Sequence, residues 1–477
     1  MITTRKSGSA LFRARDNGRR RLMAAYCVAG LGAAILAAPA AAQTPGEAVL
    51  YAFQGPTSDG EDNANGLVAG PGGILYGATT FGGSGDCTGY GYPTPIGCGV
   101  VYKLTPPATS GGAWTEKILH SFTGGLDGAF PNTLAVSKGG ILYGTTFGGG
   151  PGQSTGSGYG VVFKLTPPTT SGAGWKETVM YTFCKQTNCT DGNNPNDGPI
   201  LVGGDLYGTT GYGGANGYGT VYQVTTAATP AFTSLYSFKG GSTDGADAYY
   251  GLVANKSGTL YGETHGGGGT GCGGSGCGTV YEITPPAAAG DPYTETILYS
   301  FPGGDDGQDP SGRLTVSGAD LLGVAGGGTY NYGIVYKLAP PTTGTVWTET
   351  VLTSFDPGAL YGVPGGTYAN GSLVAGANGS IYGTTYGGGD PNLQLGYYFP
   401  GTIFELTPPI ETGGAWVQSL LYSFQGGTDG LTPEWGLIVG PDGTLYGTTS
   451  VGGGTGCPAQ MFNGTNIGCG TVFQFTP

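Results

Sequence analysis

The chain has 477 residues, of which 102 are glycine and only 10% are charged, and its formal net charge is −13. Such an acidic chain lacks the basic footprint that nucleic acids and anionic lipids require, so we expect neither as a partner. The chain is also longer than most single domains, which points to a repeat-built fold or to several domains.

Residues 1–42 have the composition of a signal peptide. Seven of the 17 basic residues lie there, an apolar run spans Leu22–Ala38, and Ala40–Ala42 offers a cleavage site before Gln43. The run is too short and too rich in Ala and Gly to favour a permanent transmembrane helix. Removing this leader leaves 10 Lys and Arg against 29 Asp and Glu, a net charge of about −19. We therefore expect a secreted or periplasmic bacterial protein, exported by the Sec or Tat route, with residues 43–477 as one domain.

From residue 47 onward the chain consists of seven copies of one repeat. The landmark Leu-Tyr-Gly recurs at intervals of 54 to 67 residues, with a degenerate fifth copy. Its glycines are Gly77, Gly144, Gly208, Gly262, Gly323, Gly383 and Gly447. A near-fixed period of this length is typical of propellers and solenoids.

Each copy reads as four short strands. In the first copy these are Gly66–Gly70, the Leu-Tyr-Gly segment around Gly77, Val101–Pro106 and Trp114–Phe122. The strands alternate apolar and polar residues and are rich in Val, Tyr, Thr and Phe, as half-buried strands are. No helical periodicity follows the leader, so the sequence predicts an all-β fold.

Tight turns join the first and second strands of the copies. They are Gly72-Gly73, Gly139-Gly140, Asn378-Gly379 and Asp442-Gly443. Such pairs predict two-residue hairpins in which both central residues have positive φ.

Seven four-stranded antiparallel units predict a seven-bladed β-propeller. The last copy stops at Thr476-Pro477, after its third strand, and an additional strand, Glu47–Phe53, precedes the first copy. Both departures are explained if the N-terminal strand completes the last blade and closes the ring. A linear solenoid would instead need polar capping repeats, which the sequence lacks.

Eight cysteines follow the leader, in four close pairs. The pairs are Cys87/Cys98, Cys184/Cys189, Cys272/Cys277 and Cys457/Cys469. An even number in an exported chain indicates disulfides, which would pin the Gly-rich loops. Metal ligation is the alternative, but the Cys-x₂-Cys spacing of zinc sites is missing.

Antiparallel alternation places the loops between strands two and three on one face, together with the crossings between blades. This loop face carries all four cysteine pairs and a recurring Asp-Gly. Long, variable loops on a rigid scaffold commonly carry binding residues. The candidate ligand-contacting residues are Asp59, Asp127, Asp191, Asp244, Asp306, Asp429, Glu263, His265 and Trp435.

The recurring Asp has two interpretations. It can cap its own turn while Gly takes positive φ, or a ring of carboxylates can bind Ca²⁺. The calcium candidates are Asp305, Asp306, Asp309, Asp191 and Asp197. We favour the structural interpretation, because a residue in nearly every copy serves the repeat, and we expect no cofactor. Glu263 and His265 could do acid–base chemistry, but a polar loop contact is the simpler interpretation.

The composite motif LYSFxGGxDG…GL…DGxLYGTT…GGG…GTVFxxTP, present across Leu421–Pro477, resembles the GloVer (Gloeo/Verruco) tandem-repeat family of secreted bacterial proteins. The resemblance covers essentially all of residues 47–477 and implies a β-propeller. The family offers no settled activity or catalytic residues to carry over. Its members carry varied C-terminal anchors or sorting tails, whereas this chain ends with its last repeat, so we expect release or periplasmic residence.

We expect a monomeric binding or structural module, rather than an enzyme, with a carbohydrate or protein ligand on the loop face. The alternative is a hydrolase or lyase that acts on extracellular polysaccharide through loop-face carboxylates. An enzyme predicts carboxylates from different blades that converge at the axis with perturbed pKa values, whereas a binder predicts evenly spread Asp and exposed aromatic residues. Calcium-dependent assembly, a third hypothesis, predicts a melting temperature that falls on adding chelator.

Overall fold

Antiparallel sheets account for nearly all regular structure in the protein. The computed structural model describes residues 46–477 apart from 56–58, 64, 89–95, 110, 152–157, 171, 287, 289–290, 357–365, 390–399, 412, 454–456, 458–460, 463–464 and 467. The predicted signal peptide, residues 1–42, lies outside the described residues.

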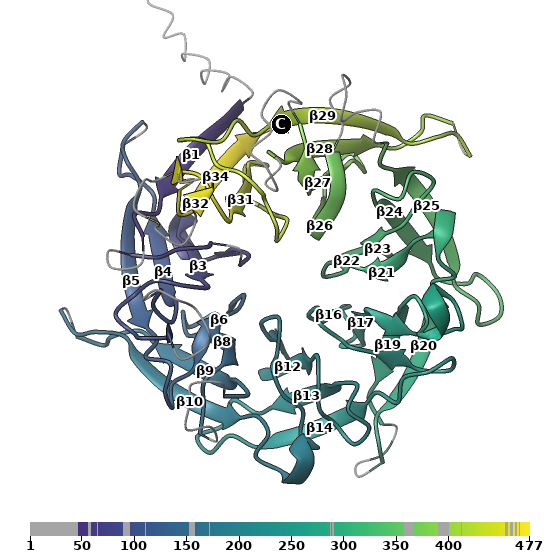
Figure 1. The fold of residues 1–477 in the computed structure, drawn as a ribbon, viewed down its shortest axis with the longest axis horizontal. Coiled ribbons are helices and arrows are strands. Elements are labelled where there is room, and N and C mark those ends of the chain that lie inside the picture. Colours follow the sequence, from purple (N-terminus) through teal and green to yellow (C-terminus); the bar gives the residue numbers. More distant parts are fainter. Residues whose placement is uncertain are drawn as a thin grey trace, which may run out of the picture. The chain divides into compact units, whose positions relative to one another are not determined.

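Seven sheets surround one axis, like the blades of a wheel (Figure 1). In the first blade the order from axis to rim is β2 (Val68–Ala69), β3 (Leu75–Thr79), β4 (Val100–Thr105) and β5 (Thr115–Ser121). Neighbouring strands are antiparallel throughout. The predicted all-β, seven-bladed propeller is therefore confirmed.

The next five blades repeat this order from axis to rim. Blade two has β6 (Ala129–Pro131), β7 (Ala135–Val136), β8 (Leu142–Gly148), β9 (Val161–Thr166) and β10 (Lys176–Thr182). Blade three has β11 (Ile200–Val202), β12 (Asp205–Thr210), β13 (Thr220–Val224) and β14 (Phe232–Ser237).

Blade four has β16 (Val253–Ala254), β17 (Leu260–Thr264), β19 (Thr279–Thr284) and β20 (Thr294–Ser300). Blade five has β21 (Gln308–Pro310), β22 (Thr315–Ser317), β23 (Asp320–Gly326), β24 (Ile334–Ala339) and β25 (Thr348–Ser354). Blade six has β26 (Gly366–Ala375), β27 (Ile381–Gly388), β28 (Thr402–Thr407) and β29 (Val417–Ser423).

Short elements decorate the loops. They are β15 (Gly245–Ala246), which pairs with β18 (Gly266–Gly267), β32 (Met461–Phe462), which pairs with β33 (Thr465–Asn466), and the 3₁₀ turns η1 (Pro71–Gly73), η3 (Thr187–Cys189), η4 (Cys272–Gly274) and η5 (Gly304–Asp306). None of the helices in the described part of the chain has the length and apolar composition that crossing a membrane requires.

The seventh blade is built from both ends of the chain. Its order is β30 (Leu437–Val439), β31 (Leu445–Thr449), β34 (Thr471–Thr476) and β1 (Gly46–Ala52). Strand β1 is antiparallel to β34, and Glu47 lies opposite Phe475. This pairing confirms the predicted closure of the ring by the N-terminal strand.

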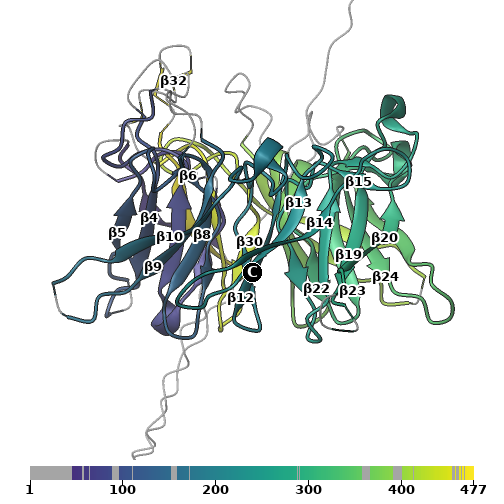
Figure 2. The same cartoon turned by 90° about the horizontal axis from the view of Figure 1, so that it is seen from below.

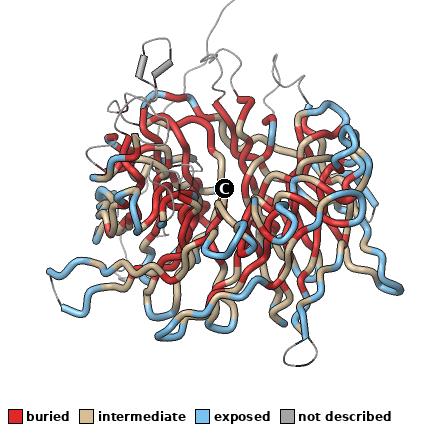
Figure 3. Tube along the Cα trace, turned by 60° about the horizontal axis from the view of Figure 1, so that its bottom comes forward, coloured by how far each residue is buried: buried red, intermediate tan, exposed pale blue. Residues whose placement is uncertain are grey.

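The landmark glycine of each repeat makes room for an aromatic ring on the neighbouring strand. In blade three, a Cβ atom on Gly208 would lie 2.4 Å from the hydroxyl oxygen of Tyr222, its cross-strand partner. The third strands of the other blades place a Tyr or Phe in the same way. These rings are buried between the blades, where the red trace of Figure 3 is densest. Glycine and aromatic residue are thus one packing unit, repeated seven times.

The predicted two-residue hairpins are only partly correct. Gly72 and Gly73 both have positive φ, as expected. In the other three turns only the second residue does, because each is a three-residue loop that ends in a left-handed glycine; for example, the Gly140 amide donates to the Ser137 carbonyl at 2.9 Å. A type I turn followed by a left-handed residue joins such strands equally well.

All four predicted disulfides are present, between Cys87 and Cys98, Cys184 and Cys189, Cys272 and Cys277, and Cys457 and Cys469. They belong to the loop face, the side on which β15 and β32 lie in Figure 2.

Candidate functional site

The recurring Asp residues mostly fasten their own crossings. Asp59 accepts hydrogen bonds from the Tyr51 hydroxyl at 2.5 Å and from three backbone amides, those of Gln54, Gly55 and Gly60. Asp191 and Asp244 likewise accept from Tyr hydroxyl groups and amides. We call this contact between a rim-strand Tyr and the crossing Asp the Tyr–Asp latch.

Three of the crossings vary the latch. His120 occupies the tyrosine position of blade one and lies 3.5 Å from Asp127, which also accepts two bonds from Thr123. Asp429 accepts from the Gln425 amide. Asp306 is exposed on η5. The six Asp residues are spread one per crossing around the ring and do not converge, and their role as ligand contacts stays a prediction.

A glutamate of the next rim strand faces five of these crossings. These seam glutamates are Glu47, Glu116, Glu177, Glu295 and Glu349. Burial, with the neighbouring Asp429 as the second cause, raises the pKa of Glu47 to about 8. Burial, with Asp59 as the second cause, raises the pKa of Glu116 to about 7. Burial disfavours the charged form of a carboxyl group, and a nearby carboxylate adds to the effect.

A second feature of the crossings concerns the residue two positions after Gly in Asp-Gly. In all seven blades the residue at this position is left-handed although it is not glycine, with φ between 48° and 60°. The crossing into blade six lacks Asp-Gly, and there the residue is Tyr368, two positions after Gly366. We call the seven residues the left-handed ring: Asp62, Phe130, Asn194, Asp247, Asp309, Tyr368 and Thr432. Non-glycine residues rarely adopt this conformation, and such strained residues gather at functional sites.

The preceding blade holds each member of this ring by one hydrogen bond. The amide of each residue donates to a carbonyl just before the third strand of that blade, at 2.7 to 3.2 Å. The acceptors are Cys98, Tyr159, Tyr218, Cys277, Tyr332, Pro400 and Cys469. Three of the four disulfides thus fix an acceptor of the ring, which gives them a role beyond pinning flexible loops.

Two adjacent pockets on the loop face include members of the ring. One, of about 740 Å³, is lined by Tyr218, Asp247, His265 and Asp309, among others. The other, of about 180 Å³, shares Asp309 and is lined also by Tyr250, Ser311, Tyr368, Asn370 and Tyr386. We call this hollow, which runs over blades three to six, the loop-face arc. It combines aromatic rings with carboxyl, amide and imidazole groups.

Within the arc, burial raises the pKa of Asp247, and the nearby His265 partly opposes that shift. His265 is exposed and its ring lies 5.6 Å from that of Tyr249. The predicted site residue His265 therefore belongs to the arc.

Glu263, its neighbour in the sequence, is instead buried and accepts a hydrogen bond from the Tyr336 hydroxyl. The structure does not bring the two together as an acid–base pair. Burial raises the pKa of Glu263 to about 8, and the bond from Tyr336 partly opposes that shift.

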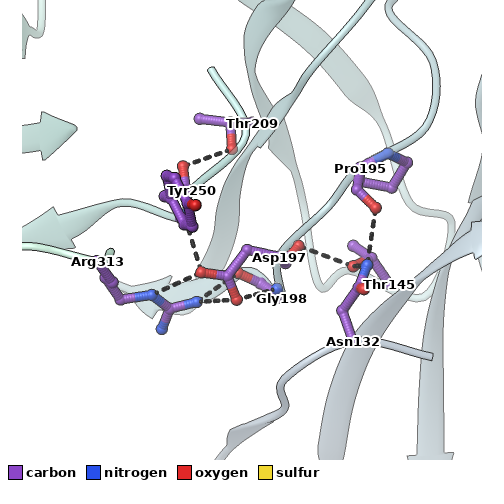
Figure 4. Close-up of polar contacts among 9 residues, drawn as sticks. Asn132, Thr145, Pro195, Asp197, Gly198, Thr209, Tyr250 and Arg313 are labelled. Atoms are coloured by element: carbon purple, nitrogen blue, oxygen red, sulfur yellow. Dashed lines mark hydrogen bonds and ion pairs between the residues drawn. The ribbon is translucent and has the colours of Figure 1, made fainter. Parts of the chain in front are cut away.

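An ion pair joins blade three to blade five (Figure 4). Arg313 of blade five donates to both carboxyl oxygens of Asp197 of blade three, at 2.7 and 3.1 Å, and to the Gly198 carbonyl. The Asp197 side chain is 1% exposed, and it also accepts the Gly251 amide of the blade between. Three blades are therefore tied by one carboxylate.

Two carboxyl groups from neighbouring crossings interact near the axis. Burial, with the charge of Asp62 as second cause, raises the pKa of Glu434 to about 8, and burial raises the pKa of Asp62 to about 6. Trp435, the next residue, lies with its ring 6.5 Å from Tyr250. Glu434 belongs to the crossing into blade seven and Asp62 to the crossing into blade one.

The calcium candidates are not assembled into a site. Asp197 is paired with Arg313, Asp191 is held by its latch, and Asp305 is exposed on η5. In the described part of the chain no group of three or more His, Cys, Asp or Glu side chains is placed to hold a metal ion.

The left-handed ring and the Asp197–Arg313 pair were missed by reasoning on the repeat, which directs attention to residues that recur. A usable signal existed, since the position of the left-handed ring has no side chain common to all copies: it is Asp in three of them and Phe, Asn, Tyr or Thr in the other four. The ion pair joins residues more than a hundred positions apart, and no spacing rule connects them.

The sequence matches one family model, described as the Gloeobacter/Verrucomicrobia repeat, over residues 87–325 and 270–462. No curated protein sequence matches the chain.

Three of the similar solved structures are a β-propeller domain and two enzymes. The Cps50 (Swd1) β-propeller domain of Myceliophteria thermophila is 12% identical, covers 91% of this chain and all of that domain, and has a TM-score of 0.45. An endosialidase of phage phi92 is 12% identical over 90% of this chain and 68% of its own, with a TM-score of 0.44. A PQQ-bound aldose sugar dehydrogenase of Streptomyces coelicolor is 11% identical over 79% and 97%, with a TM-score of 0.38. These similarities are too remote to carry an argument about function.

Proposed function

This chain belongs to the Gloeobacter/Verrucomicrobia repeat family, and we propose that it is a secreted or periplasmic glycan-binding module that uses the loop-face arc. The observation that carries the proposal is the composition of the arc, in which Tyr218 and Tyr368 are exposed beside Asp247 and Asp309. Tyrosine offers a flat apolar face with a polar tip, which suits a sugar ring, and carboxylates accept hydrogen bonds from its hydroxyl groups.

The charge of the arc selects among glycans. Asp247 and Asp309 line the hollow in a chain with a net charge of −13, and the field of such a surface repels anions. We therefore expect neutral polysaccharides to bind better than uronic or sialic acid polymers. The four disulfides, which hold the loops around the arc, fit an exported protein.

The test is a glycan-array screen followed by calorimetric titration of the best neutral oligosaccharide. Tyr368→Asn removes the ring while Asn tolerates the left-handed backbone, and Asp309→Asn keeps the shape and removes the charge. We expect each to weaken binding at least about tenfold, or 1.4 kcal/mol. Phe147→Ala is the matched control, because Phe147 is an exposed aromatic residue of blade two, outside the arc. Equal losses in all three variants, or no glycan binding, would refute the proposal.

A second candidate function is cleavage of a polysaccharide, as a hydrolase or a lyase, and the observation that favours it is the interaction of Asp62 with Glu434. Two carboxyl groups whose pKa values are pushed apart, here to about 6 and about 8, can act as base and acid. Neither of them lines the two pockets of the arc, which is why we place binding first. Release of reducing ends that disappears in Glu434→Gln but persists in Tyr368→Asn would reverse this order.

A further inference from the structure

A separate cavity of about 220 Å³ lies at the axis, between the inner segments of several blades. Its polar lining consists of Thr133, Asp197, Arg313, Ser372 and Trp435, and its apolar lining includes Leu67, Val68, Leu437 and Ile438. We propose that this axial cavity binds one small neutral polyhydroxy molecule, such as a single sugar ring. It shares no lining residue with the loop-face arc, so the proposal does not depend on the function assigned to the arc.

The size of the cavity favours a ligand of a single ring. A liquid water molecule takes up about 30 Å³, so the cavity has room for about seven waters or one pyranose. An oligosaccharide would need a much longer hollow. Gly66 also lines the cavity, and a Cβ atom there would make ordinary contacts of 3.6 Å with the Thr133 methyl carbon and 3.8 Å with Trp435, so a side chain at this position would take up part of the space.

The charges that line the cavity cancel. Asp197 and Arg313 are its two charged lining residues, and they already bind each other through two hydrogen bonds. An anion would be repelled by Asp197 and a cation by Arg313, so neither finds an uncompensated partner. Each carboxyl oxygen of Asp197 already accepts two hydrogen bonds, so the member of the pair that can meet a ligand hydroxyl group is the Arg313 guanidinium, as a donor.

The cavity also holds an unsatisfied polar atom. Thr133 is 8% exposed, and its hydroxyl oxygen has no hydrogen-bond partner among the residues that the structure describes. Leaving a buried hydroxyl group unpaired costs free energy, and a ligand hydroxyl group or a water molecule removes that cost.

The rest of the lining is apolar. The Trp435 ring, polar only at its N–H group, and the four aliphatic side chains named above can pack on the C–H face of a sugar ring, while Thr133, Ser372 and Arg313 meet its hydroxyl groups. This mixture of polar and apolar lining residues suits a sugar ring better than it suits water alone.

The test is saturation-transfer NMR and calorimetry of the purified protein with glucose, galactose, mannose, glucuronate and glucosamine. We expect at least one neutral hexose to bind, with glucuronate and glucosamine bound at least about tenfold more weakly. Thr133→Val, which has nearly the same shape, should weaken hexose binding about tenfold, and Trp435→Phe should weaken it while the ring still fills its place.

The arc variant Tyr368→Asn is the control, and it should leave hexose binding unchanged. Conversely, Thr133→Val should leave oligosaccharide binding to the arc unchanged, so failure of one proposal is distinguishable from failure of the other. The proposal is overturned if no hexose binds, if the charged sugars bind as well, or if Thr133→Val and Trp435→Phe bind like the original protein. In the first case the cavity holds water only, in the second its charges do not select neutral ligands, and in the third the hexose binds elsewhere.

Discussion

The rim of the propeller and its axis are built on opposite principles. At the rim, blade after blade repeats the same contacts, in which a Tyr or His of the rim strand meets the crossing Asp and most blades add a seam glutamate. At the axis each blade contributes something different, such as Asp197, Tyr250, Arg313 or Trp435. Recurring residues hold the ring together, whereas the residues that depart from the repeat line its hollows.

The left-handed ring lies at the boundary between the two regions. Its backbone is as regular as the rim, with the same φ range and the same hydrogen bond in all seven blades. Its side chains, like those at the axis, differ between blades. A fixed backbone with a free choice of side chain is a suitable arrangement for changing a ligand without changing the fold.

The largest effect on stability is expected from breaking the ion pair at the axis. Arg313→Ala leaves Asp197 charged and buried, so the free energy of unfolding should fall by about 3–5 kcal/mol in urea denaturation. The matched control is Lys337→Ala, since Lys337 and Asp320 form a half-exposed pair 3.7 Å apart and should contribute at most about 1 kcal/mol. Equal losses would mean that the axial pair does not brace the three blades it joins.

A smaller loss is expected from opening one latch at the rim. Asp244→Ala removes the acceptor of the Tyr236 hydroxyl and of the Lys239 and Gly245 amides, and should cost about 2–3 kcal/mol. Asp291→Ala, at an exposed Asp in the turn before β20, should change stability by no more than about 0.5 kcal/mol. If both substitutions lowered the free energy of unfolding equally little, the recurring Asp would not stabilise the crossing and could instead contact a ligand.

The seam glutamates make the rim sensitive to pH. Their folded pKa values, about 8 for Glu47 and about 7 for Glu116, Glu295 and Glu349, lie above the unfolded value of about 4.3. A raised folded pKa gives a stabilising contribution that is complete below the unfolded pKa and is lost as pH rises through the folded pKa. We expect the melting temperature to fall by about 5 °C or more between pH 5 and pH 9.

Substitution of one seam glutamate isolates this effect. Glu349→Gln should flatten the pH dependence, whereas Glu411→Gln, at an exposed glutamate, should leave it unchanged. A melting temperature that rises from pH 5 to pH 9 would contradict the assignment of these pKa shifts.

The smallest change in stability is expected at the left-handed ring. Tyr368→Asn relieves the strain of a positive φ of 56° but loses the ring contact with Tyr332, so the free energy of unfolding should change by less than about 1 kcal/mol. Thermal denaturation beside the glycan titration measures both quantities on one sample. A variant that loses several kcal/mol would place Tyr368 with the recurring, structural residues.

The fold could be predicted because the features that determine it recur. The glycine of Leu-Tyr-Gly and the aromatic residue of the third strand appear in register in each copy, and Gly208 with Tyr222 shows why neither can change alone. The additional strand Glu47–Phe53 and the last repeat, which lacks its fourth strand, together predicted the closure of the ring, because each supplies what the other lacks. The turns were harder, because Asn378-Gly379 and Asp442-Gly443 suit two kinds of hairpin equally well.

The site could be predicted only in outline. The loop face was identified by strand alternation, and His265 and Trp435 do line hollows. The residues that matter most in the two proposals, such as Tyr368 and Thr133, are single departures from the repeat. The sequence alone does not show which departures line a pocket, because that depends on where the blades place them in space. Asp197 and Arg313 meet only because the ring closes its blades around a common axis.

The pairing of β1 with β34 has a consequence for how the protein comes into being. Strand β1 precedes the six complete blades in the chain and β34 follows them, so blade seven cannot be completed until β34 has been synthesised and released. Contacts between segments so far apart in the sequence carry a high entropic cost of ordering and form slowly. Until β34 is in place, the ring stays open between blades six and one.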